Sequence, residues 1–323
     1  MMAHGASTLK GDSLYYDRKI RVGRAFNNVE AIDSTQNALL LGNYGEYHEV
    51  SEMSIMTDSA QFIQIQKNDS LYMHADTIMS IKDSLLTKTD TAHFTIIKAF
   101  YKVKVFKSDF QAKCDSLIYT LLDSTFELHR YPVMWSGKNQ ITANFVKVIT
   151  KNNELEEVQM FNNSLIVSQS DTIRFDQIRG KDMVAYLDSN QLSRIDVKDD
   201  GAAIYFGREK EKLVGVNKIT CVDMKIYMAN NEVDYINFYK NPEGTLYPPF
   251  YLADEELKFD NFEWNEHHRP KSKEDIFKWI EETLKKTETG KKAIDLNAPV
   301  NEKSNKKDDK KPEIGNKGKS TGK

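Results

Sequence analysis

Cysteine and proline are both scarce in this sequence. Its 323 residues include only two cysteines, Cys114 and Cys221, whose number and wide separation exclude a disulfide framework and a cysteine metal site. Two interpretations of these cysteines remain open: they are either two small buried side chains or the partners of one long-range disulfide. Prolines number seven, and the adjacent Pro248 and Pro249 are expected to end a sheet, because proline cannot donate to a strand ladder.

Long apolar runs are absent as well. No window reaches the roughly 18 apolar residues of a membrane-spanning helix. The stretch 1–10 lacks the apolar core of a signal peptide, which taken literally indicates a cytosolic protein. The first repeat nevertheless begins at Asp12, whereas repeat arrays normally start with an atypical capping unit. We therefore expect a chain that is truncated or mis-started at its N-terminus.

Neither charge nor motifs point to nucleic acid or to catalysis. The formal net charge of −3 gives no electrostatic argument for binding nucleic acid. Hydrolase elbows, Walker loops, dinucleotide fingerprints and His-Glu-x-x-His are all missing. His267 and His268 are adjacent, so in a strand they would point to opposite faces; a solvated loop is the favoured interpretation. We expect no catalytic residue, no metal ligand and no cofactor.

The sequence does contain two recurring phrases. Asp-Ser-Leu begins at Asp12, Asp69 and Asp115, and this repeated aspartate is interpreted as a turn or edge residue. In the later half an Asn-centred turn recurs, with an apolar residue at a constant offset behind it. Its copies are Asn153-Glu154-Leu155 before Val158, Asn190-Gln191-Leu192 before Ile195, and Asn231-Glu232-Val233 before Ile236. Repeats of this kind predict stacked units that share one elongated β fold.

The strands themselves are marked by period-2 alternation. Such alternation means one buried face and one wet face, and it predicts an all-β domain over residues 8–262. Apolar residues on the buried face would form either a closed core or a groove for acyl chains. The candidate lining residues for a lipid are Leu14, Tyr16, Leu71, Met73, Val103, Val105, Phe126, Leu128, Ile173, Phe175, Ile195, Val197, Met224 and Ile226.

The C-terminal part has a different composition. Ser272 as a cap and an apolar stripe through Ile276, Ile280 and Leu284 predict a short amphipathic helix over 270–286, either packed on the sheet or docking a partner. From Lys285 onward there are 12 lysines against 6 acidic residues and no aromatic residue. The segment 287–323 is therefore predicted to be a disordered lysine-rich tail.

Several longer blocks resemble the organic-solvent-tolerance (OstA-like) family, in its Bacteroidetes form. The resemblance extends over roughly residues 8–278. The blocks that carry it are Gly11–Asp17, Gly23–Val29, Gly42–Tyr47, Lys113–Leu117, Trp135–Ala143 and Gly215–Lys218.

The resemblance implies a fold and a function. The family is related to LptA and to the periplasmic part of LptD, which implies an elongated β-jellyroll, a twisted V of two antiparallel sheets. It also implies a non-enzymatic, periplasmic role in lipopolysaccharide transport and outer-membrane assembly. Lipid A acyl chains would lie in the apolar groove, and other jellyroll components or further copies would join through sheet edges.

Two alternatives remain open at this point. One is a structural envelope protein that pairs through its sheet edges and has a filled interior. The other is a polysaccharide-active enzyme on a β-solenoid, which would need unlike acidic residues clustered outside the repeat register.

Overall fold

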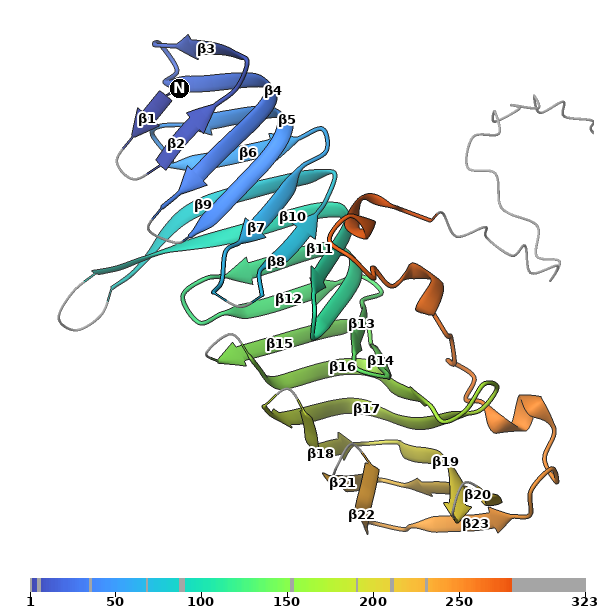
Figure 1. Cartoon of the computed structure of the whole chain (residues 1–323). Coiled ribbons are helices and arrows are strands. Elements are labelled where there is room, and N and C mark those ends of the chain that lie inside the picture. Colours follow the sequence, from blue (N-terminus) through green and yellow to red (C-terminus); the bar gives the residue numbers. More distant parts are fainter. Residues whose placement is uncertain are drawn as a thin grey trace, which may run out of the picture. The chain divides into compact units, whose positions relative to one another are not determined.

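The structure, a computed structural model, describes residues 2–280 apart from 5–6, 35–36, 68, 87–90, 152–153, 190, 210–211 and 230–231. Residues Met1–Ile280 belong to one compact unit, and the second unit, Glu281–Lys323, lies outside the described residues. The described part is a 23-stranded antiparallel assembly with three 3₁₀ turns (Figure 1). The prediction of an all-β, jellyroll-like fold is confirmed.

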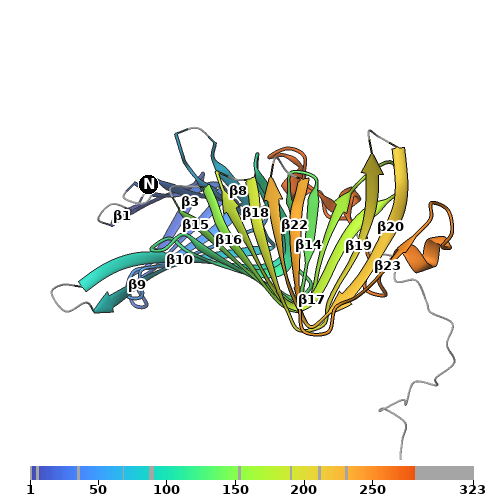
Figure 2. The same ribbon diagram turned by 90° about the horizontal axis from the view of Figure 1, so that it is seen from below.

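The strands form two walls that share some of their members. Six strands bend and run through both walls: β4 (Val22–Asp33), β5 (Ala38–His48), β10 (Thr91–Lys107), β11 (Phe110–Thr120), β16 (Glu154–Gln169) and β17 (Phe175–Asp188). Figure 2 shows the walls diverging from the line where β17 bends. We call them wall A and wall B.

Wall A is completed by β1 (Met2–His4), β2 (Ser7–Lys10), β7 (Gln61–Gln64), β8 (Leu71–His74), β13 (Val133–Ser136), β14 (Asn139–Thr142), β19 (Gly201–Glu209), β20 (Lys212–Cys221) and β23 (Glu243–Tyr247). Wall B is completed by β3 (Ser13–Asp17), β6 (Met53–Thr57), β9 (Thr77–Leu86), β12 (Thr125–His129), β15 (Phe145–Lys151), β18 (Gln191–Lys198), β21 (Asp223–Ala229) and β22 (Glu232–Tyr239).

A recurring pair of left-handed residues makes the bend between the walls. Asn27 and Asn28 in β4, and Asn162 and Asn163 in β16, have positive φ where the strand register shifts. The carbonyl of Asn27 accepts the Asp12 N–H at 3.0 Å. Equivalent backbone bonds recur up and down the stack, from Asn43 to Asp58, Asp76 to Tyr101, Asn144 to Asn162, Lys181 to Asp199 and Val222 to Lys240. Asn and Asp suit these corners because they tolerate the left-handed conformation.

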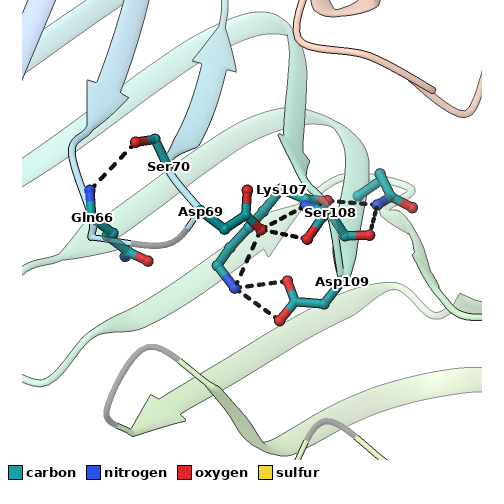
Figure 3. A network of polar contacts seen from close by, with 7 residues as sticks. Gln66, Asp69, Ser70, Lys107, Ser108 and Asp109 are labelled. Atoms are coloured by element: carbon teal, nitrogen blue, oxygen red, sulfur yellow. Dashed lines mark hydrogen bonds and ion pairs between the residues drawn. The ribbon is translucent and has the colours of Figure 1, made fainter.

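The two sequence phrases have different outcomes. Around the Asn-centred phrase, the strand pairs β15–β16, β17–β18 and β21–β22 have the same register shift, and Val158, Ile195 and Ile236 pair with equivalent partners. Asn153, Asn190 and Asn231 themselves lie outside the described residues, so the turns stay a prediction. Of the three aspartates, Asp12 and Asp69 lie outside strands, whereas Asp115 is within β11, and their positions are not equivalent. Asp12 is at a corner, where the Asn28 side chain donates to it at 2.9 Å. Asp69 is at the rim, by which we mean the edge of a wall farthest from the corners, and there the Ser108 N–H donates to it at 2.9 Å (Figure 3).

The inner faces of the walls form one continuous apolar core. The walls are in contact where the ring of Phe62 in wall A lies 6.1 Å from that of Tyr119 in wall B, and the ring of Phe110 lies 5.9 Å from that of Phe126. At the rim of this N-terminal half, Lys82 of wall B donates to Asp33 of wall A at 2.8 Å. The interior is therefore closed in this part of the stack.

The outer face of wall A is covered by the chain that follows β23. We call residues 248–280 the strap. It contains the 3₁₀ turns η1 (Asp254–Leu257), η2 (Glu266–His268) and η3 (Asp275–Phe277). Leu257 and Phe259 of the strap pack on Ile204, Phe206 and Val216 in a second, smaller core. Figure 1 shows the strap running back along the stack.

Glutamine side chains hold the strap to wall A. Gln177 donates to Leu257 O at 2.8 Å and accepts Phe259 N–H at 3.0 Å. Gln140 repeats the arrangement, donating to Glu263 O at 2.6 Å and accepting Asn265 N–H at 2.7 Å. Both belong to one row of laterally paired residues across the wall, which reads Gln111, Trp135, Gln140, Val167, Gln177, Ile204. The row is almost completely buried.

The predicted helix over 270–286 is wrong for its described part. Residues 270–280 contain only the single turn η3, and 281–286 lie outside the described residues. Contacts with wall A stabilise the non-helical conformation of this segment. Ile276 is buried, the Phe277 ring lies 4.7 Å from the His74 ring, and Lys104 donates to Lys278 O. The predicted tail 287–323 also lies outside the described residues, and the boundary of the predicted β domain, 8–262, stays a prediction.

Candidate functional site

Most predicted lining residues lie in the closed core. Leu71, Met73, Val103, Val105, Phe126, Leu128, Ile195, Val197, Met224 and Ile226 are all buried within it, and Leu14 packs partly against it. They face inward as the alternation predicted. Some, such as Met224, lie near a corner and others, such as Leu71 and Phe126, lie near the rim, and all pack within the protein core. Lipid contact at these positions stays untested.

Three predicted lining residues are elsewhere. Ile173 is in the turn between β16 and β17 and is 71% exposed. Phe175 faces outward and packs against Phe262 and Trp264 of the strap. Tyr16 is 40% exposed on the end strand of wall B, where its hydroxyl donates to Glu49. Alternation failed for the first two because the strand begins only at Phe175, and its outer side is covered by the strap.

A cavity of about 340 Å³ opens between the walls in the C-terminal half. Its apolar lining comes from both walls, with Met134, Ile141 and Ile166 from wall A and Val158, Ala185, Leu187, Leu192 and Met228 from wall B. Ser136, Gly137, Lys138, Asn139 and Gln191 supply polar groups at its mouth. Gly137 and Lys138 are exposed, so the cavity reaches the surface.

Alternation predicted that these residues face inward but did not separate cavity-lining residues from core residues. Their position along the strand does. Met228 continues the inward series Met224, Ile226 by one more step away from the corner, and Leu187 does the same after Ala185. In this half of the stack, inward residues farther from the corner line the cavity, whereas those next to the corner, such as Met183 and Met224, are packed in the core.

A buried carboxylate faces the rim beside this mouth. Asp176 accepts the Phe206 N–H at 2.9 Å. Burial raises the pKa of Asp176 to about 6, and the N–H of Phe206 and the charge of Lys138 oppose that rise. Asp171 lies in the adjacent turn and pairs with Arg174 at 2.7 Å and with Arg208, and these hydrogen bonds hold its pKa well below the usual range in spite of desolvation.

The remaining polar groups do not form a site. In the part of the chain that the structure describes, no three His, Cys, Asp or Glu side chains converge to hold a metal ion. His268, in turn η2 of the strap, is 2% exposed, so the predicted solvated loop is wrong for this residue. Cys114 and Cys221 are both free and buried, which corresponds to the first of the two interpretations. None of the described helices has the length and apolar character needed to span a bilayer.

Comparison with known proteins gives a likeness among solved structures alone. No family model matches the chain, and no curated protein matches it. Among solved structures it is similar to LptH of Pseudomonas aeruginosa, described as the LptA homologous periplasmic component of the conserved lipopolysaccharide transport device. The identity is 15%, the alignment covers 38% of this chain and 82% of LptH, and the TM-score is 0.31. A likeness of this size carries no functional argument, and membership of the OstA-like family stays a prediction.

Proposed function

We propose that this protein is a non-enzymatic lipid carrier of the bacterial envelope, which shelters an acyl chain of lipopolysaccharide in the cavity between its walls. The observation that carries the proposal is the apolar lining contributed by both walls, open at a polar mouth. Ligand pockets are typically about 300–1,000 Å³ and mostly apolar with a few polar groups, and this cavity is at the lower end of that range.

The size of the cavity sharpens the proposal. At about 340 Å³ it suits a single aliphatic chain better than a whole multi-acylated lipid. Partly buried Leu192, Val233, Ile236 and Phe238 continue the inward face toward the end of the stack. Further chains would lie along these residues, and sugars would stay in water outside the mouth.

The proposal includes partners and a compartment. The end strands β1 and β3, and β22 and β23 at the other end, have free edges within the described residues. Exposed edges can add a strand from another molecule, so other jellyroll components of a transport bridge or further copies of this chain would join there. Periplasmic residence belongs to the same proposal.

The test is crosslinking from inside the cavity. A photoreactive residue in place of Leu187 should crosslink lipopolysaccharide, and Ala185→Phe should reduce that yield at least about tenfold by filling the space. Val184→Phe, on the same strand but on the outer face of wall B, is the matched control. Equal crosslinking in folded Ala185→Phe and Val184→Phe variants would contradict the proposal.

The closed N-terminal half favours a second candidate, a structural envelope protein joined through its edges. Between the walls there, the Phe62 ring lies 6.1 Å from Tyr119 and the Phe110 ring 5.9 Å from Phe126, so aromatic side chains fill the described interior around them. Purified protein that carries no extractable lipid and assembles through β3 or β23 would support this candidate.

A further inference from the structure

A set of large apolar side chains stands out from the rim of wall A, next to the cavity mouth. Ile173 in the β16–β17 turn is 71% exposed, and Leu246 of β23 is 67% exposed. In the loop after β23, Phe250 is 84% exposed and Tyr251 is 71% exposed. Exposed apolar side chains that gather on one part of a surface indicate an interaction site, whereas isolated ones do not.

These side chains and the cavity mouth are linked by specific contacts. The Arg174 guanidinium lies 5.5 Å from the centre of the Phe250 ring, and Tyr251 lies 5.9 Å from Tyr247. Arg174 shares Asp171 with Arg208 of β19. Two residues before Arg208, the Phe206 N–H binds Asp176, whose carboxylate is influenced by Lys138 at the mouth. The protruding side chains and the mouth therefore occupy one continuous rim.

From this arrangement we infer that the rim is a membrane-binding edge, which inserts Ile173, Leu246, Phe250 and Tyr251 into the interface of a phospholipid bilayer. Aromatic residues with neighbouring arginine and lysine are the side chains that interfaces favour, because their apolar part enters the acyl boundary while the polar part stays among head groups. The inserted edge would bring the cavity mouth to the surface of the leaflet.

A bilayer fits this rim better than a protein partner does. The side chains come from two separate turns and a strand end, and they project outward instead of forming a flat, close-packed face. A fluid interface accommodates such projections individually, whereas a protein partner would need a complementary hollow for each one. Because Arg174 and Arg208 are already paired with Asp171, the attraction should depend on apolar insertion more than on charge.

Membrane binding by the rim is independent of the proposed lipid carriage, so the two can fail separately. The experiment is flotation of the full chain with phosphatidylcholine vesicles at about 0.5 M salt, where electrostatic attraction is strongly screened. Phe250→Ser combined with Tyr251→Ser should lower the vesicle-bound fraction at least about tenfold. Tyr131→Ser is the matched control, because Tyr131 is 86% exposed at a corner remote from the rim.

A tryptophan reporter gives an independent readout. Phe250→Trp should show a blue-shifted emission and protection from an aqueous quencher when vesicles are added, and Tyr131→Trp should show neither. Two results would overturn the inference: equal flotation of the rim and corner variants, or binding that requires anionic lipid and disappears at high salt. Both can be observed whether or not the cavity ever holds a lipid chain.

Discussion

Replacing Gln140 by leucine measures how tightly the strap is bound to wall A. Its side chain is fully buried and makes two hydrogen bonds to the strap backbone, at 2.6 Å to Glu263 O and 2.7 Å from Asn265 N. Leucine has similar volume but offers no partner. The Glu263 carbonyl and the Asn265 N–H would then be left without their partner under the strap.

The structure allows the cost to be worked out. Each lost hydrogen bond is worth about 1 kcal/mol, and an unsatisfied buried polar group costs about 1–3 kcal/mol. Local movement of the strap toward water would recover part of this. We therefore expect Gln140→Leu to lower the free energy of unfolding by about 2–4 kcal/mol. Gln177→Leu should behave similarly, because its two bonds to the strap have the same geometry.

Urea denaturation together with amide hydrogen exchange provides the assay. The variant should exchange the Asn265 amide much faster than the parent protein, while amides of wall B keep their protection. Gln159→Leu is the matched control, since this glutamine of wall B binds only the side chain of Glu157, and its loss should cost under about 0.5 kcal/mol. The reasoning is refuted if both variants lose equal stability or if strap exchange is unchanged.

Two further predictions concern pH. Since burial raises the pKa of Asp176 from 3.8 to about 6, the folded state binds its proton more tightly than the unfolded chain. Protonation of Asp176 therefore stabilises the fold as pH falls from about 6 toward 4, and Asp176→Asn should remove this gain while raising stability at neutral pH by on the order of 2 kcal/mol. Lys104 is buried opposite Lys113, and desolvation, followed by the charge of that neighbour, lowers its pKa from 10.5 to about 8. The fold should therefore gain stability relative to a Lys104→Met variant as pH rises from about 8 to 10.5; parallel denaturation profiles of the two proteins would contradict this.

The repeats and the alternation were sufficient to predict the fold class. The strand pairs that contain Val158, Ile195 and Ile236 join segments close together in the sequence, so a short apolar pattern is enough to predict them. Two of the corners coincide with Asn pairs in the sequence, Asn27-Asn28 and Asn162-Asn163. The pairs can be interpreted as corners only once it is known that one strand belongs to both walls.

The cavity could not be predicted from alternation. Alternation shows which face of a strand is buried, but not how far that face lies from the opposite wall. Met224 and Met228 face the same way, yet Met224 is buried in the core and Met228 lines the cavity. The strap was missed for a related reason. Gln140 and Gln177 are polar residues on an outward face, a pattern that normally indicates solvent, and only the segment beyond residue 248 explains their burial.

The corner hydrogen bond that recurs from Asp12–Asn27 to Val222–Lys240 makes the length of this protein adjustable in whole units. Every level ends with the same backbone geometry with which the next begins, so an in-frame duplication or deletion between two equivalent corners would leave the remaining joints unchanged. Evolution could thus lengthen or shorten such a chain without redesigning either end.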